Sequence, residues 1–361
     1  MSNYDEALER FRIVGLEYAD GLSNHGPMAA EALVGLGHQA LIPALVDVYA
    51  PRLPAARAGR VLSEAEQASA RGRVEHAADQ VATFEARLEA AADWRDVIAR
   101  EVPPLLPGLF AATGHGLLRT AHAIRALERE DSALRRGELA RGLAHWSSRY
   151  QTLPGHPPPS GAPPADPATL AVRLEVWPHL ADASARDQLF FEAVRRLDAE
   201  PRFVEAMDAI GRPAVGRAGL DAFLDALVRT GAALYLAHPD DRIAYAHAVT
   251  IPEAVRSVAP HLSETDASAA GWYALQAVGA LHAVFGGIGD GAPGEPSETV
   301  RRTAESWDEI RYRAACSLQE HAIKLAEACL RADRRAPDPI FALAAADAAL
   351  ELEGRRSAGN C

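Results

Sequence analysis

The chain has one lysine among its 37 lysine and arginine residues, and this residue, Lys324, follows His321 by about one helical turn. A lysine amine can lose its proton and act as a base or nucleophile, or take up carbon dioxide and become a carbamate, an anionic oxygen ligand. Arginine stays protonated in proteins and can do none of this. The position therefore suggests that Lys324 has a chemical role. The alternative is that an arginine-rich sequence has one lysine here without such a role.

Histidines supply the other candidate ligands. The chain has 13 of them, and several lie in apolar segments with helical spacing. Buried imidazoles need partners for both ring nitrogens, either hydrogen bonds or a metal ion. His25 precedes Pro27, which fits the first turn of a helix. The helix dipole at such a position favours neutral imidazole, the form that binds metals; a capping or turn role is the alternative.

A second group lies in one predicted helix, where His115, Arg119 and His122 share a face because they are spaced by four and three residues. Such a polar stripe fits either a solvated helix face or the wall of a polar cavity. In a cavity wall, Arg119 or His122 could transfer protons.

Two further histidines lie in apolar runs, His247 in DRIAYAHAVTIPEAV and His282 in QAVGALHAVFGG. We expect Pro252 to open the helix after His247. Either histidine can be a core residue satisfied by hydrogen bonds, and His282, at a helix end that favours a cation, is a reserve candidate for a ligand or pocket wall. Near a divalent ion, an unmodified Lys324 would be repelled, so there it is expected to be neutral or carbamylated.

Imidazole suits zinc, copper, iron and nickel. Several imidazoles with one carboxylate-like oxygen would leave a position on iron(II) open for dioxygen or substrate, whereas zinc with the same ligands would favour hydrolysis.

The elements that position these residues are predicted to be helices, because Ala, Leu, Glu and Arg at helical spacing dominate and strand signals are scarce. The fold class predicted is all-α, a multi-helix bundle or array of packed helical hairpins with a buried polar metal site. The predicted helices cover about 4–12, 27–36, 39–50, 64–92, 94–101, 104–112, 115–129, 132–151, 167–175, 186–198, 202–210, 217–236, 249–261, 265–285, 297–330 and 338–354.

The domain organisation follows from one segment rich in proline and glycine, LPGHPPPSGAPPADP at 153–167, which cannot continue a helix. It is predicted to link an N-terminal helical half, 1–152, to a C-terminal helical half, 168–354. We expect the two halves to form one compact unit and 355–361 to be a flexible tail.

Bulk properties exclude several classes of function. The net charge of -12 disfavours nucleic acid and anionic membranes as partners. No apolar run approaches the roughly 20 residues of a membrane-spanning helix, and the polar first residues do not resemble a signal peptide. The three cysteines show no paired spacing, which favours a reducing cytoplasm. The GxGxxG string from Gly289 to Gly294 follows a predicted helix rather than a strand, so a dinucleotide loop is not expected.

Over most of its length the chain resembles the questin oxidase-like family. The resemblance rests on four segments in the same order, LSNHGPMAAEALVGLG, GHGLLRTAHAIRAL, IAYAHAVTIPEAVRS and WDEIRYRAACSLQEHAIKLAEA. It implies a helical enzyme that contains non-haem iron(II) and uses dioxygen to break a ring carbon–carbon bond. The substrate implied is an aromatic polyketide, an anthraquinone-like phenol or quinol, cleaved by ring opening or Baeyer–Villiger-like oxygen insertion.

The same resemblance implies a set of iron ligands, namely His25, His115, His247, His321 and a carbamylated Lys324. The candidates for catalytic or pocket-wall roles are Arg119, His122 and His282. Two departures matter: Arg119 stands where fungal members carry a second histidine, and Gln319 stands where they often carry aspartate. The exact substrate, the choice between mono- and dioxygenase, and the oligomeric state therefore stay open.

Two alternatives belong to other classes. A zinc or dinuclear hydrolase could use a carbamylated lysine, but the motifs contain no HxH pair or matching aspartate. A non-catalytic helical ligand-binding protein would use its histidines structurally. The expected partner is a small aromatic molecule, and any reductant would come from the substrate or from a diffusible donor.

Overall fold

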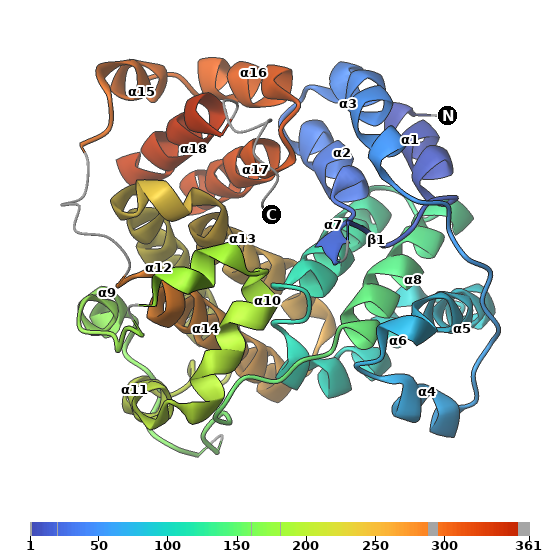
Figure 1. Cartoon of the computed structure of the whole chain (residues 1–361), viewed down its shortest axis with the longest axis horizontal. Helices are drawn as coiled ribbons and strands as arrows, with labels where there is room; N and C mark the ends of the chain where they lie inside the picture. Colours follow the sequence, from blue (N-terminus) through green and yellow to red (C-terminus); the bar gives the residue numbers. More distant parts are fainter. Residues whose placement is uncertain (1, 20, 160, 181, 288–294, 353–361) are drawn as a thin grey trace. The chain divides into compact units, whose positions relative to one another are not determined.

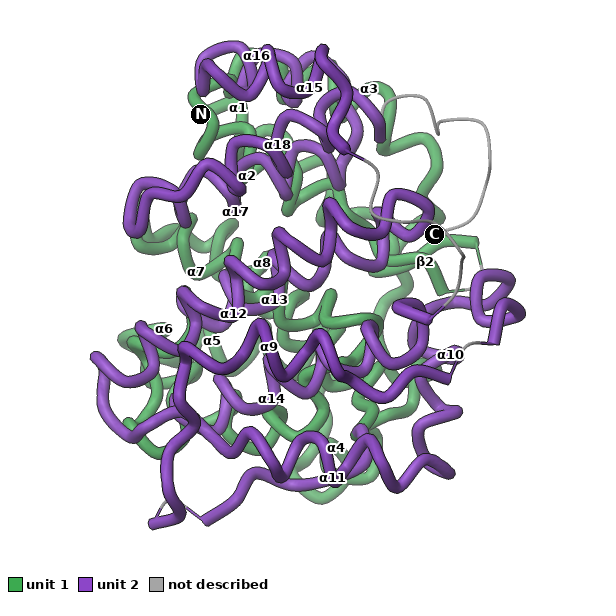
Figure 2. The backbone as a smooth tube through the Cα atoms, turned by 90° about the vertical axis from the view of Figure 1, so that its left-hand side faces the viewer, with its two compact units in different colours: residues 1–152, 257–266 green, residues 153–256, 267–361 purple. Residues whose placement is uncertain are grey.

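The computed structural model describes residues 2–19, 21–159, 161–180, 182–287 and 295–352. The chain divides into two compact units, residues 1–152 with 257–266, and residues 153–256 with 267–361 (Figure 2). The change at Leu153 coincides with the first residue of the predicted linker. The predicted tail at 355–361 and the string from Gly289 to Gly294 lie outside the described residues.

The first unit contains helices and one small antiparallel hairpin, of which β1 is labelled in Figure 1. The helices are α1 (Asn3–Phe11), α2 (Gly26–Gly35), α3 (Ile42–Tyr49), α4 (Glu64–Ala70), α5 (Ala77–Ala90), α6 (Trp94–Glu101), α7 (His115–Arg129) and α8 (Ala133–Ser148). The hairpin pairs β1 (Glu17–Tyr18) with β2 (Leu22–Ser23) and was not predicted.

The second unit is also built from helices. They are α9 (Leu170–Glu175), α10 (Phe190–Ala193), α11 (Pro201–Ile210), α12 (Arg217–Ala237), α13 (Arg242–Val258), α14 (Glu264–Phe285), α15 (Glu298–Thr303), α16 (Trp307–Ser317), α17 (Glu320–Arg335) and α18 (Pro339–Glu351). The last two residues of α13 and the first three of α14 count with the first unit. Short 3-10 turns occur in both units, and the prediction of an all-α fold is confirmed.

Two long predicted helices are interrupted, one of them twice, and the backbone explains two of these three breaks. The helix predicted at 64–92 is divided because Gly72 adopts a left-handed conformation, φ +74°, and donates its N–H to the carbonyl of Ser147. The helix predicted at 297–330 is divided into α15, α16 and α17. The second of these breaks follows Leu318, which has a φ of 50°, a conformation that an α-helix cannot continue.

Prolines account for two other differences. The helix predicted at 104–112 is instead a 3-10 turn at Pro103–Gly108, a segment whose prolines lack N–H donors. The prediction that Pro252 opens a helix is wrong, because α13 begins at Arg242 and Pro252 lies in its interior. His247 is therefore a mid-helix residue rather than one that precedes a helix.

The first unit is organised around α8, which packs against α1, α5 and α7. Gly116 allows the close approach of α7, because a Cβ at that position would overlap the backbone of Trp146 in α8. Trp146 is fully buried and its indole donates to the carbonyl of Gly108 at 2.9 Å. The close contact of Gly116 with Trp146 places α8 against the N-terminal end of α7, where His115 lies.

In the second unit, α17 packs against α16 and α18, and α12 packs against α9 and α18. At Gly231, α12 approaches α13 so closely that a Cβ would overlap the carbonyl oxygen of Ala248. Within the described part of the chain, no helix combines the length and the apolar character needed to cross a bilayer.

Candidate metal centre

His25 lies where the sequence predicted, at the N-cap of α2 with Pro27 in the first turn. Its side chain is 3% exposed. The backbone is fixed by Tyr49, whose hydroxyl accepts the His25 N–H at 2.8 Å and donates to the carbonyl of Ser23 at 3.3 Å. The imidazole is thus held at the N-terminal end of a helix.

His115 is the first residue of α7, directly after Gly114, whose φ is 80°. Its Nδ1–H donates to the carbonyl of Ala112 at 2.5 Å, which leaves the lone pair on Nε2. The rings of His25 and His115 stack with centroids 4.5 Å apart at 15°, and one ligand nitrogen of each lies within 4.8 Å of the other. The first unit therefore contains a buried imidazole pair with the donor chemistry of a metal site.

The second unit contains a similar pair. His247 donates Nδ1–H to the carbonyl of Ile243, one turn earlier in α13, at 2.8 Å. His321 follows the capping residue Gln319 at the start of α17. Their ring centroids are 5.9 Å apart, and both side chains are buried. Because histidines that bind metals commonly donate their other N–H to a carbonyl, His115 and His247 fit an ion at Nε2.

Lys324 lies one turn after His321 and is 3% exposed. Burial, together with the positive charge of Lys324, lowers the pKa of His247 to about 3. His247 is therefore neutral at physiological pH. Conversion of the Lys324 amine to a carbamate would replace its positive charge by a negative one.

Gln319 occupies the position at which the resemblance expects aspartate. Its Oε1 accepts the N–H of Ala322 at 2.8 Å and so caps α17. Its amide nitrogen lies 3.4 Å from Nδ1 of His321. An amide at this point does not add the negative charge that a carboxylate would bring to the histidine.

The other predicted residues of the first unit contact buried carboxylates. Arg119 is 0% exposed and donates to both oxygens of Glu138 in α8, at 2.6 and 2.8 Å. His122 lies with Nδ1 2.6 Å from Glu31 of α2. The polar stripe on α7 is thus buried rather than solvated, and its catalytic role stays a prediction.

His282 lies in a cluster of its own in the second unit. The hydroxyl of Tyr245 donates to its Nδ1 at 2.8 Å, and its Nε2–H donates to the carbonyl of Leu174 at 3.0 Å. Burial and the neighbouring His179 and His238 lower the pKa of His282 to about 3. Both ring nitrogens of His282 therefore form hydrogen bonds within the protein. Its role in the pocket wall stays a prediction.

Three buried glutamates that contact these helices received no role from the sequence, namely Glu31, Glu138 and Glu253. Glu31 and Glu253 lie in the apolar runs MAAEALV and TIPEAV, and both are at most 1% exposed. Burial by itself raises the pKa of Glu31. The opposite effect of Arg125, His122 and Arg129 is larger, so the pKa lies well below its usual value. A lone carboxylate within an apolar helix segment was the signal that could have identified such residues.

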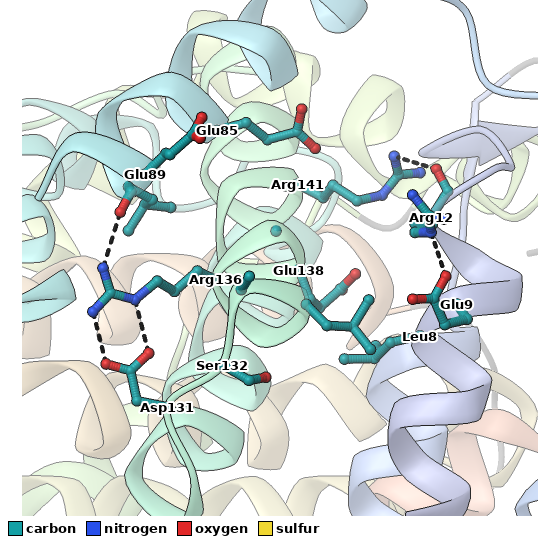
Figure 3. A pocket seen from close by; sticks show the side chains of 14 residues that line it. Leu8, Glu9, Arg12, Glu85, Glu89, Asp131, Ser132, Arg136, Glu138 and Arg141 are labelled. Atoms are coloured by element: carbon teal, nitrogen blue, oxygen red, sulfur yellow. Dashed lines mark hydrogen bonds and ion pairs between the residues drawn. The ribbon is translucent and has the colours of Figure 1, made fainter. Parts of the chain in front are cut away.

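A cleft of about 900 Å³ lies among α1, α5 and α8 of the first unit (Figure 3). Its lining is rich in charged side chains that pair with one another, Arg12 with Glu9 and Arg136 with Asp131. Arg141 donates to the backbone carbonyl of Arg12. None of the predicted site residues lines this cleft, and its charge makes it unlike a pocket for an aromatic ring.

Comparison of the chain with models of known protein families finds no match, and comparison with curated proteins finds none.

Proposed function

We propose that this protein is a metal-dependent oxygenase that holds non-haem iron(II) and uses dioxygen to cleave a ring carbon–carbon bond of an aromatic, anthraquinone-like phenol or quinol. The observation that carries the proposal is the buried imidazole pair in each unit, with the single lysine beside one of them. The four segments that resemble the questin oxidase-like family carry these same residues.

We propose as ligands of one metal ion the residues that the resemblance implies, namely His25, His115, His247, His321 and Lys324. Imidazole nitrogen suits iron(II), and His115 and His247 direct Nδ1–H to carbonyls, so that Nε2 is the donor. When bound, iron(II) would supply the redox chemistry by which dioxygen reacts with an electron-rich ring.

The role of Lys324 is to supply negative charge. Its neutral amine attacks carbon dioxide, the Nζ–C bond forms, and one proton leaves the nitrogen, which gives a carbamate. The two imidazole pairs are neutral ligands, so this anion would offset the charge of the ion.

Aromatic side chains beside His247 fit the proposed substrate. The ring centroid of Phe190 lies 6.1 Å from that of His247 and 5.2 Å from that of Phe285, in edge-to-face geometry. We assign these rings to the binding of the aromatic substrate and to the exclusion of water from the imidazoles.

Substitution of Phe190 by alanine is expected to raise KM by about tenfold, because an aromatic contact and its apolar area are lost. Metal content and the far-UV circular dichroism spectrum should stay as in the wild type. Steady-state kinetics with a phenolic or quinol substrate measure the effect. An unchanged KM would remove Phe190 from the substrate pocket.

Metal analysis of the purified protein tests the proposal directly. We expect one iron per chain, and its loss in His25→Ala and His321→Ala, because each removes a ligand. His145→Ala is the matched control, since His145 is also buried but pairs with Glu17. Folded wild-type protein that binds no metal would refute the proposal, and zinc in place of iron would favour a hydrolase.

We also propose a cytoplasmic location. Its support is that Cys316 and Cys329 are free thiols. The net charge of -12 supports small-molecule rather than nucleic-acid partners.

A further inference from the structure

The two units contain the same arrangement of ion pairs on their histidine-bearing helices. In the first unit, α2 follows His25 and carries Glu31 six residues later, and its neighbour α7 begins at His115. In the second unit, α13 carries His247 and, again six residues later, Glu253. Its neighbour α17 carries His321 at its start.

Each glutamate forms ion pairs with two arginines of the neighbouring helix. Glu31 pairs with Arg125 and with Arg129, whose Nη2 lies 2.8 Å from Oε1. Glu253 pairs with Arg335 and with Arg331, whose Nη1 lies 3.0 Å from Oε2.

The positions of these arginines correspond in sequence. Arg125 and Arg331 follow the histidine of their own helix by ten residues, and Arg129 and Arg335 follow it by fourteen. Aligned on the histidine, HGLLRTAHAIRALER and HAIKLAEACLRADRR agree at the histidine, at both arginines and at the alanine after the first arginine. On an α-helix these spacings place the histidine and both arginines on one face.

Among the positions at which the two segments differ, one lies beside the histidine and could carry chemistry. The residue three after the histidine is Lys324 in α17 but Leu118 in α7. The second unit alone therefore places an amine on this face beside its histidine.

The buried glutamates restrict how each helix pair can pack. Glu31 is 1% exposed and Glu253 is 0% exposed. If either neighbouring helix shifted by one turn or rotated, the buried carboxylate would lose its guanidinium partners, which is strongly unfavourable. The arginines lie about 15 and about 21 Å along the helix from the histidine, ten and fourteen residues later at about 1.5 Å each. Because the arginines and the histidine belong to one continuous helix, a shift at the ion pair also displaces the imidazole.

We propose that the two units contain copies of one helix-pair module, in which Glu31 and Glu253 are positioning residues that set the register of the two histidine-bearing helices of their own unit. The proposal rests on the proposed function in one respect, namely that the register serves to present imidazoles to a metal.

Glu31→Gln and Glu253→Gln test the module, with two readouts. In metal-free protein labelled with 15N in its imidazoles, Glu253→Gln is expected to shift the ring signals of His247 and His321 and leave those of His25 and His115. Glu31→Gln should do the reverse. Each variant should weaken Co²⁺ binding about tenfold or more and change the Co²⁺ absorption bands, as altered ligand positioning does.

Glu101→Gln is the matched control, because Glu101 pairs with Arg87 of α5 at 2.8 Å on helices that carry none of the four histidines. It should leave the ring signals and Co²⁺ affinity unchanged. If either glutamine variant does not fold, Arg129→Gln and Arg335→Gln replace it. Their side chains are 41% and 29% exposed, so a smaller shift in the same direction is expected.

The module is refuted if folded Glu253→Gln keeps wild-type ring signals for His247 and His321 together with wild-type Co²⁺ affinity. Wild-type protein that binds no Co²⁺ would instead refute the metal assignment. In that case, the ring signals of the metal-free variants still decide whether the glutamates position the histidines.

Discussion

Substitution of Lys324 by arginine is expected to abolish iron binding and turnover, although it conserves the positive charge. Arginine cannot lose its proton and cannot form a carbamate, so a permanent cation would lie beside His247 and His321. Repulsion of a divalent ion by this cation adds to the loss of an anionic ligand. Metal analysis and Co²⁺ titration measure the effect, with a loss of affinity of at least a hundredfold expected.

Chemical rescue separates the missing anion from a general packing defect. Lys324→Ala opens space beside His321, and added formate or acetate should restore part of the Co²⁺ binding by supplying a carboxylate. The same salts should not restore Lys324→Arg, because the guanidinium still fills the space. An arginine variant with a full complement of iron would rule out the carbamate.

The second large effect concerns Arg119 rather than the metal ligands. Glu138→Gln is expected to lower the free energy of unfolding by about 3–5 kcal/mol, because it leaves a guanidinium that is 0% exposed without its anionic partner. Urea denaturation followed by circular dichroism measures the change. A variant as stable as the wild type would show that the Arg119–Glu138 pair contributes little.

A paired substitution identifies what Arg119 does. Replacing both partners, Arg119→Met with Glu138→Leu, removes both buried charges and should recover most of the stability lost in Glu138→Gln. If this double variant also retains turnover, Arg119 has no role in substrate binding. If it is stable but inactive, the sequence-based prediction of a catalytic Arg119 is supported.

The helical class and most helix ends could be predicted because they depend on local physics. Helical spacing of apolar residues and capping side chains such as Ser132 and Asp338 act within a few residues. The breaks at Gly72 and Leu318 were missed because each needs a left-handed backbone, which composition does not reveal. Pro252 was given too much weight as a helix start, since packing of the surrounding helix outweighs its local cost.

Within the candidate site, the side chains near a helix start were the predictable part. His25 beside Pro27 and His321 beside a capping residue have a local signature. The partners of buried charges do not, because Glu31, Glu138 and Glu253 are matched by residues on other helices. Sequence spacing along one helix could place Arg119 and His122 on a common face, but only the packed fold shows that carboxylates cover that face.

The crossing of α12 and α13 at Gly231 has a consequence for how this protein can vary. Pro252 has no N–H, so the carbonyl oxygen of Ala248, one turn before it, lacks its usual helical donor and lies against Gly231. A methyl group on α12 at this position would overlap α13 and displace it. The displacement would include His247, which directly precedes Ala248. Among natural variants and in mutational libraries, this inconspicuous glycine should therefore tolerate replacement as poorly as a ligand does, although it touches no ion and no substrate.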